Sequence, residues 1–229
     1  MRAPRRAALA ALLMLAGCTL PHPKPPPPSA AGARTPAQLL ASVQAAAQRI
    51  DQSEPGARAA LVAAASASAR QCLAQAPHDA ACQYAQAQAL GLTAREHPIE
   101  APGLLKQMLA SLARAEALDP GLDHAGPARL SAVVLMRAPP WPLGPGDVEA
   151  ATAAAQRAVQ REPGYPPNLI ALAEAQSKSA GAAAARASFN QAQQALDGWQ
   201  GAPEEPAAQR DADRAQWRAS IAQGLQELR

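Results

Sequence analysis

Cysteine thiols are the side chains with the clearest chemistry in this sequence. There are three of them, Cys18, Cys72 and Cys82. Cys18 ends the segment Leu15-Ala16-Gly17-Cys18, in which small residues stand directly before a nucleophilic sulfur. Cleavage of the chain before Cys18 and acylation of its sulfur need these two features together. We therefore expect Cys18 to be modified, which leaves Cys72 and Cys82 as the remaining thiols.

The N-terminal residues explain how such a modification would arise. Three arginines precede an apolar run over 7–16 that is too short to remain as a membrane anchor, so residues 1–17 are predicted to be a signal peptide. The end of the run resembles the lipobox of bacterial lipoproteins, in which the cysteine receives a diacylglycerol. The resemblance implies lipidation of Cys18 and anchoring in the cell envelope. Thr19, in place of aspartate, favours the periplasmic face of the outer membrane over the inner membrane.

Cys72 and Cys82 lie close to the end of one predicted helix and the start of the next. The short Pro77-His78 turn between them would bring the two positions together, and an exported protein meets an oxidising compartment. We predict a Cys72–Cys82 disulfide that contributes about 2–3 kcal/mol through loop entropy. A redox or metal role has no support from a second cysteine pair or a histidine cluster.

Other side chains with catalytic potential are scattered. Each histidine is expected to be a solvated or capping residue; the four are His22, His78, His97 and His124. Carboxylate pairs such as Glu204-Glu205 belong to a polar run that indicates a solvated helix start. The sequence has no nucleophile elbow, zinc-binding helix motif or phosphate-binding glycine loop. We therefore expect no catalysis, no cofactor and no metal.

Charge excludes one class of partner. The chain has 21 Lys and Arg residues against 18 Asp and Glu residues, but Arg2, Arg5 and Arg6 lie in the predicted signal peptide. The mature chain is therefore formally neutral and lacks the basic surface that phosphate backbones attract. No nucleic-acid binding is expected, although the sequence pI is near 9.0.

The mature chain divides into a stalk and one domain. Residues 18–34 contain the proline run over 25–28 and predict an extended stalk that could span some 50 Å, at roughly 3.1 Å per residue. Residues 35–229 are rich in alanine and poor in β-branched residues, which favours helix throughout and no sheet. Breakers and apolar periodicity predict nine helices, over 36–51, 55–76, 79–96, 101–118, 123–137, 146–161, 165–179, 182–196 and 204–228.

Three helix ends follow a common pattern. Pro77, Pro120 and Pro163 are 43 residues apart, and each follows an alanine-rich helix and precedes a new one. These endings resemble the end of a tetratricopeptide repeat, although the interval exceeds that family's repeat of about 34 residues. The resemblance implies an all-α fold, an irregular solenoid of stacked helical hairpins with a concave surface for ligands or partners.

The segment 118–196 carries a second resemblance. Its motifs include Gly126-Pro127-Ala128-Arg129-Leu130, Ala138-Pro139-Pro140-Trp141-Pro142-Leu143 and Glu162-Pro163-Gly164-Tyr165-Pro166-Pro167-Asn168. These motifs resemble the T component lipoproteins of tripartite ATP-independent periplasmic (TRAP) transporters, some of which form trimers with a central pore. The resemblance implies a periplasmic solute-binding protein as partner, homo-oligomerisation, and a ligand or partner surface. Its expected residues are Arg129, Met136, Trp141, Leu143, Tyr165 and Asn168.

The stretch Pro139-Pro140-Trp141-Pro142-Leu143 is the most unusual part of the domain and has two interpretations. Either Trp141 and Leu143 line a mouth or contact a partner, or the loop folds back so that Trp141 covers the core. Two functions of different classes follow for the whole chain. One is a lipid-anchored adaptor that works with a solute-binding protein and handles small apolar ligands. The other is a scaffold in envelope assembly or polysaccharide export that binds only protein.

Overall fold

The computed structural model describes residues 34–201 and 206–229, which form nine α-helices and no strand. The helices are α1 (Pro36–Asp51), α2 (Pro55–Gln75), α3 (Ala80–Glu96), α4 (Ala101–Leu118), α5 (Leu122–Arg137), α6 (Val148–Arg161), α7 (Pro166–Ser179), α8 (Ala182–Gly198) and α9 (Ala207–Glu227). The predicted all-α fold of helical hairpins is confirmed; ten of the eighteen predicted helix bounds are identical to the observed ones, and the other eight differ by one to three residues. The predictions for residues 1–33 lie outside the described residues.

Local sequence signals account for where the helices begin. The Thr35 hydroxyl accepts from the backbone N–H of Gln38, and the Gln38 side chain accepts from the N–H of Thr35, which makes a complete capping box. Asp79 and Asp147 cap α3 and α6 with their carboxylates. Proline stands in the first turn of α1, α2, α4 and α7, where its missing N–H costs no helical hydrogen bond.

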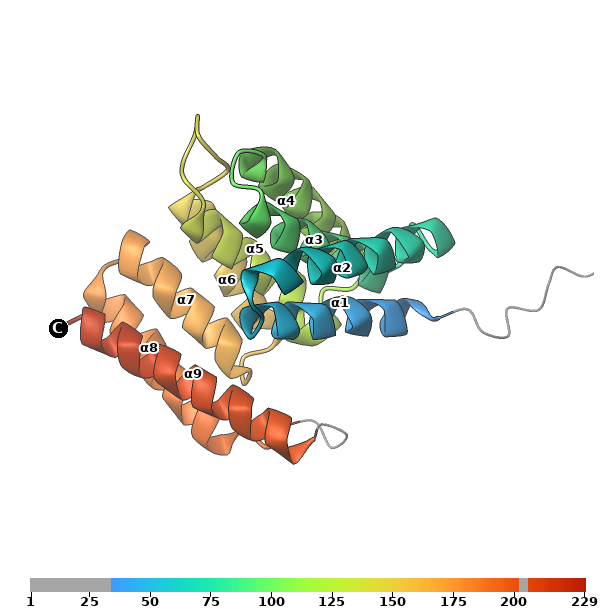
Figure 1. Ribbon diagram of the computed structural model, residues 1–229. Coiled ribbons are helices and arrows are strands. Elements are labelled where there is room, and N and C mark those ends of the chain that lie inside the picture. The colour runs from blue at the N-terminus through green and yellow to red at the C-terminus, as the bar shows by residue number, and fades with distance from the viewer. Residues whose placement is uncertain (1–33, 202–205) are drawn as a thin grey trace, which may run out of the picture. The chain divides into compact units, whose positions relative to one another are not determined.

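Consecutive helices pair as α1–α2, α3–α4, α5–α6 and α7–α8, and α9 packs against α7 and α8 (Figure 1). Each odd-numbered helix also packs against the next odd-numbered helix, whereas the backbones of the even-numbered helices stay apart within the described residues. The Arg157–Glu116 ion pair links the even helices α6 and α4 through side chains. The odd helices therefore form an inner layer and the even helices an outer one. All turns from an odd helix to the following even helix lie at one edge of the array.

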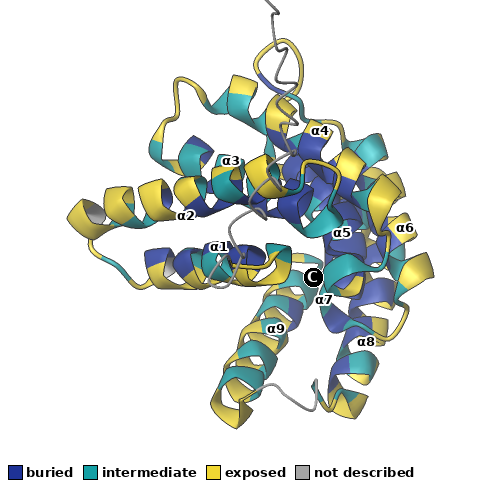
Figure 2. Cartoon of the chain, turned by 90° about the vertical axis from the view of Figure 1, so that its right-hand side faces the viewer, coloured by how far each residue is buried: buried dark blue, intermediate teal, exposed yellow. Residues whose placement is uncertain are grey.

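The buried residues lie where neighbouring helices face each other (Figure 2), and many of them are alanine. One cluster of buried apolar residues contains side chains from each of the helices α1, α2, α3, α4 and α5, and a second contains side chains from α7, α8 and α9. Small side chains let neighbouring helices approach closely, so a core with few aromatic residues can still be dense. None of the helices in the described ranges is long and apolar enough to cross a membrane.

Helix α9 packs against the second cluster through a close contact between Gly224 and Phe189. Phe189 of α8 is fully buried, and its ring lies where a Cβ atom at Gly224 of α9 would stand. A Cβ added at Gly224 would come within 2.1 Å of the ring carbon Cζ. Gly224 therefore lets α9 pack directly against the Phe189 ring.

The predicted disulfide between Cys72 and Cys82 is confirmed. Both residues are completely buried, and their sulfur atoms lie 2.04 Å apart across the turn between α2 and α3. The bond closes a loop with a sequence separation of 10 and lies beside Leu39 of α1. It therefore fixes the first two helical hairpins to each other.

Removing the disulfide should lower the free energy of unfolding. We expect the double variant Cys72→Ala/Cys82→Ala to lose about 2–3 kcal/mol in urea denaturation, because its unfolded chain is no longer cross-linked. The native protein measured with reductant should lose a similar amount. Alkylation of both cysteines in the exported protein without prior reduction would contradict the pairing.

Candidate functional site

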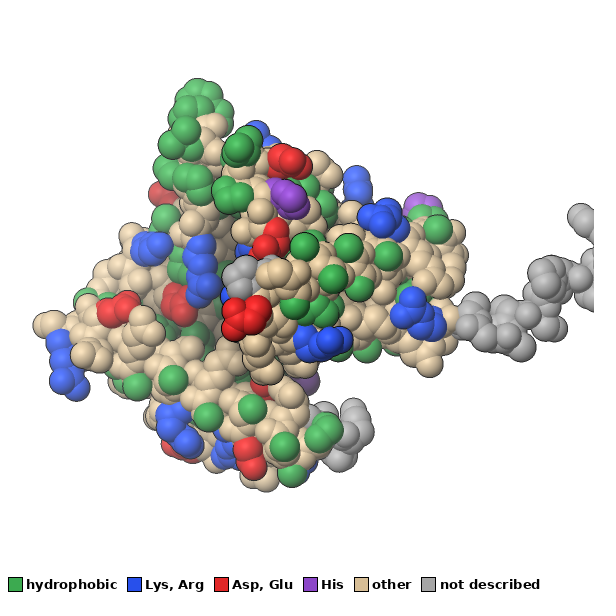
Figure 3. Space-filling model, viewed as in Figure 1, with side chains coloured by type: hydrophobic (Ala, Val, Ile, Leu, Met, Phe, Trp, Pro, Cys, Tyr) green, Lys and Arg blue, Asp and Glu red, His purple; other side chains and the backbone are tan. Residues whose placement is uncertain are grey.

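A cavity of about 1130 Å³ opens on the inner layer of helices. It is lined by residues of α1, α3, α5, α7 and α9, with Leu105 and Met108 of α4 and a few loop residues. The space-filling view shows a hollow between α7 and the α1–α2 pair, edged by basic and acidic side chains (Figure 3). The lining combines aromatic rings, glutamine amides and charged groups, so it can contact a ligand through both stacking and hydrogen bonds.

The most unusual backbone in the described residues borders this cavity. Asp123, His124 and Ala125 have φ values of 50°, 53° and 61°, so three consecutive non-glycine residues are left-handed at the start of α5. Left-handed backbone costs roughly 1–2 kcal/mol per residue for L-amino acids other than glycine. The sequence prediction that an ordinary helix begins at Asp123 is wrong: a left-handed turn comes first. Such strain persists only where the surroundings impose it.

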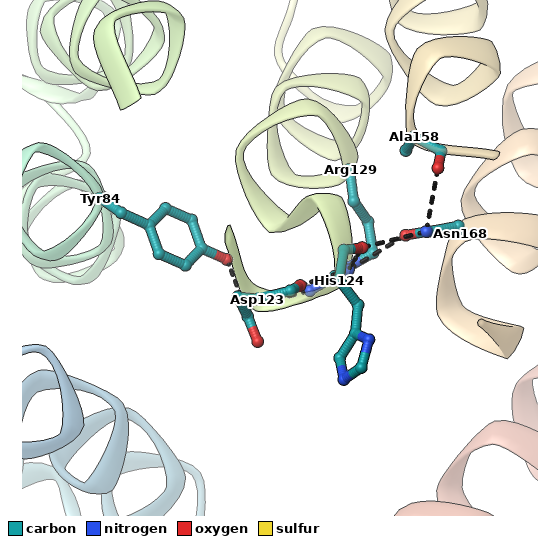
Figure 4. A network of polar contacts seen from close by, with 6 residues as sticks. All are labelled: Tyr84, Asp123, His124, Arg129, Ala158 and Asn168. Carbon is teal, nitrogen blue, oxygen red and sulfur yellow. Dashed lines mark hydrogen bonds and ion pairs between the residues drawn. The ribbon is translucent and has the colours of Figure 1, made fainter. Parts of the chain in front are cut away.

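Arg129 supplies the main support for this turn. One guanidinium nitrogen donates to the backbone carbonyls of Asp123 and His124, at 3.2 and 3.0 Å. The other forms an ion pair with Asp123 Oδ2 at 3.2 Å, and the Tyr84 hydroxyl donates to the same oxygen at 2.8 Å (Figure 4). The turn is thus held from α3 and from within α5.

Asn168 connects the turn to the next hairpin. Its side chain is completely buried, and its Oδ1 accepts from Arg129 at 3.0 Å. Its amide nitrogen lies at 3.0 Å from the carbonyl oxygen of His124 and at 3.2 Å from those of Ala158 and Glu162. This one side chain therefore joins α5, the C-terminus of α6 and α7.

Tyr84 is suited to its role as a donor. Burial of the phenol, and secondarily the negative charge of Asp123, raise the pKa of Tyr84 well above its usual value. The hydroxyl therefore keeps its proton at neutral pH. Gly126 leaves room for this contact, because a Cβ atom there would lie 2.5 Å from the Tyr84 hydroxyl oxygen.

An aromatic wall extends from the turn across the cavity. The His124 ring stacks on Tyr165 at 4.3 Å between ring centroids with an interplanar angle of 18°. Trp217 of α9 meets Tyr165 edge-on at 5.6 Å, and Trp199 meets Trp217 at 4.7 Å. Arg129 lies over the Tyr165 ring at 5.1 Å from its centroid. Helices far apart in sequence thus form one continuous ring surface.

The polar network and the aromatic wall have different exposures. Asn168 and Tyr84 are buried, whereas the imidazole of His124 is exposed and points away from the network (Figure 4). The free oxygen of Asp123 points the same way. The buried side chains hold the turn in place, and the turn presents His124 to the cavity. This arrangement offers stacking and hydrogen bonding to a ligand.

The structure places the residues expected from the family resemblance in different environments, some at the cavity and others in the core. Arg129 and Tyr165 both line the cavity and contact each other. Asn168 is not a surface residue, because it is buried beneath the turn. Met136 is not one either: it is 7% exposed and packs with Ala151 of α6 and Ala175 of α7.

Trp141 and Leu143 are 83% and 70% exposed, and neither lines the cavity. The interpretation in which Trp141 covers the core is therefore wrong. Only the base of that loop, at Ala138 and Pro139, reaches the cavity. A contact of the loop tip with a partner stays a prediction.

Four residues of the site were not predicted as site residues from the sequence, namely Tyr84, Asp123, His124 and Trp217. Tyr84 and Trp217 come from helices far from 118–196, so no local motif includes them. His124 was expected to be a solvated or capping residue; it is exposed but also stacked. The sequence Asp123-His124 before Ala125-Gly126-Pro127 was the one available signal, since Asp and His are enriched in left-handed backbone.

At His124 the glycine variant should be more stable than the alanine variant, which is the reverse of the order found in a normal helix. We expect His124→Gly to be more stable than His124→Ala by about 1 kcal/mol, because only glycine relieves the left-handed strain while both lose the ring. The measurement is the free energy of unfolding in urea. At the exposed helical position Gln107 of α4, the alanine variant should be the more stable by about 1 kcal/mol. The same order at both positions would contradict the left-handed turn.

Comparison with known proteins does not place the chain in a family. No protein-family model matches it, and no curated protein matches it either.

Proposed function

We propose that this chain is a lipid-anchored helical-repeat adaptor that binds a ligand or a segment of a partner in the cavity of its inner layer. The observation that carries the proposal is the turn at 123–125, which is held in a costly conformation beside that cavity. Strain of this kind is retained where it positions a functional group. Here the group is the exposed ring of His124.

A binding role suits the polar groups of the cavity better than a catalytic one. Asp123 Oδ2 is engaged by Tyr84 and Arg129, and Glu174 pairs with Arg137 at 3.2 Å. These pairs hold the two carboxylates in place, which suits Asp123 and Glu174 to positioning other groups more than to accepting a reacting proton. The glutamine side chains of Gln48 and Gln216 remain exposed at the walls, ready to bond a polar ligand.

The partner we propose is the solute-binding protein of a TRAP-type transporter. This part rests on the resemblance of segment 118–196 to the T component lipoproteins. The cavity supports it, because its volume of about 1130 Å³ is large enough for the small solutes that such a protein would exchange. A scaffold that binds only protein would not need a cavity of this size.

Site-specific photo-crosslinking in cells tests this proposal. A photoreactive amino acid replaces Gln48 or Gln216 at the cavity, and matched controls replace Gln107 of α4 or Gln156 of α6, which are exposed but do not line it. We expect adducts with a solute-binding protein, identified by mass spectrometry, from the two cavity positions only. Adducts from the outer positions alone would contradict a role for the cavity.

The same crosslinking experiment distinguishes the proposed adaptor from the alternative function, a scaffold that binds only protein. Adducts with envelope-assembly or polysaccharide-export proteins, and none with a solute-binding protein, would favour the scaffold.

Anchoring is tested separately by labelling with radioactive palmitate. Label should be incorporated into the native chain and absent from Cys18→Ser. Equal labelling of the two would contradict acylation at Cys18.

A further inference from the structure

The loop between α5 and α6 has an apolar tip that no other part of the described chain covers. We call residues 138–146 the proline loop. It contains no charged residue, and its exposed positions run without interruption from Pro139 to Leu143. Figures 1 and 3 show that it projects from the array and that its surface is hydrophobic. Trp141 and Leu143 are 83% and 70% exposed.

A second apolar residue lies at the same edge of the array. Ile99, in the turn between α3 and α4, is 97% exposed. Among the described residues, the other large exposed hydrophobic side chains are Leu118, Trp141 and Leu143. Both the turn of Ile99 and the proline loop join an odd helix to an even one, so three of these four residues share one edge. Leu118 lies at the opposite edge.

The backbone of the proline loop is unusually poor in unpaired donors. Four of its residues are prolines, which have no N–H. The amides of Leu143 and Gly144 donate to the Pro140 carbonyl, and that of Gly146 donates to the Pro139 carbonyl. Ala138 donates to Val134, so within the loop only the amide of Trp141 has no such bond. An unpaired donor is costly in an apolar medium, so the pairing of these amides lowers the cost of moving the loop tip out of water to a depth at which its carbonyl groups remain hydrated.

We propose that the proline loop, together with Ile99 of the α3–α4 turn, enters the interfacial region of a lipid bilayer. A projecting apolar tip needs a deep pocket on a protein partner, whereas a bilayer accepts a convex tip directly. Tryptophan prefers the membrane interface. The loop carries no charge, so its insertion requires no anionic lipid.

If the chain is tethered to the membrane, even a weak affinity of the proline loop for the bilayer is enough to keep the loop inserted. Arg34 lies sixteen positions after Cys18, a chain length whose upper limit is about 50 Å at roughly 3.1 Å per residue. An anchor at Cys18 would hold the domain near the bilayer and so give this edge a high effective concentration there. This step rests on the anchoring proposed above, but the following experiment does not depend on acylation of Cys18.

The experiment attaches residues 19–229, which include the compact unit Arg34–Arg229, to vesicles through an N-terminal histidine tag. The vesicles consist of phosphatidylcholine with a small fraction of nickel-chelating lipid. An environment-sensitive fluorophore is placed at Leu143→Cys, and a matched control carries it at Leu118→Cys. We expect a several-fold rise in fluorescence on vesicles at position 143, quenched by spin-labelled lipid, and no change at position 118.

Further variants separate the causes. Replacing Trp141 and Ile99 by serine in the Leu143→Cys background should abolish most of the rise, while circular dichroism remains unchanged because both side chains are exposed. Equal signals at positions 143 and 118, or no rise at position 143, would overturn the proposal. Capture of an identified envelope protein by a photo-crosslinker at Leu143, without fluorescence change on vesicles, would show that the tip binds protein instead.

Discussion

Replacing Arg129 by methionine should lower the free energy of unfolding by about 3 kcal/mol. Methionine retains much of the apolar stem but removes the donors to the Asp123 and His124 carbonyls, to Asp123 Oδ2 and to Asn168 Oδ1. The Arg129 side chain is 16% exposed, so water replaces these bonds only in part. Urea denaturation gives the loss directly. We also expect the left-handed turn to relax, and a lower affinity of the cavity for its ligand would report this change.

A second arginine provides a matched control. Arg157 pairs with Glu116 through two hydrogen bonds, at 2.8 and 3.2 Å, but its side chain is 51% exposed. Solvent screening limits such a pair, so Arg157→Met should cost less than about 1 kcal/mol. If both substitutions cost the same, the network around Asp123 would not hold the turn as we infer. Retention of full stability in Arg129→Met would contradict it outright.

Replacing Phe189 by alanine should cost about 3–5 kcal/mol, the largest loss that we predict. The ring is 2% exposed and packs with Leu169, Leu196 and Ile221 in the core cluster that joins α7, α8 and α9. Its removal leaves a cavity beneath α9, whose helix neighbours among the described residues are α7 and α8. Differential scanning calorimetry should show a lower melting temperature. Trp217 should also become more accessible to a soluble quencher, since α9 carries it.

The pair Phe189 and Gly224 allows a stricter test. Gly224→Ala alone should destabilise the protein by about 1–3 kcal/mol, because the overpacking against the ring outweighs the gain in helix propensity. Phe189→Leu makes room for that methyl group, so the double variant should lose less than the sum of the two single losses. Additive losses would show that the contact does not determine how α9 packs.

The helices were predictable because their signals are local. Thr35, Asp79 and Asp147 cap helices at their own positions, and proline in the first turn fixes where others begin. The Cys72–Cys82 pairing was predictable for a related reason, since a short turn alone brings the two residues together. In each case the residues that decide the outcome lie within about ten positions of one another.

The site was only partly predictable because its contacts are distant in sequence. Arg129 and Tyr165 belong to motifs within 118–196 and both line the cavity, and their role in binding a ligand or partner stays a prediction. The left-handed turn depends on Tyr84, 39 residues earlier, and on Asn168, 44 residues after His124. Local propensity alone favours a right-handed helix through Asp123, and these distant bonds override it. Met136 was wrongly placed because the face that it presents depends on how α6 and α7 pack.

The position of α9 also determines when the site exists during synthesis. The turn at 123–125, Tyr165 and the outer layer through α8 can all assemble before residues 207–227 are made. Trp217 then arrives last and closes the aromatic wall. A chain in which α9 has not yet folded therefore lacks one wall of the cavity, so premature capture of a ligand is disfavoured until this last helix is in place.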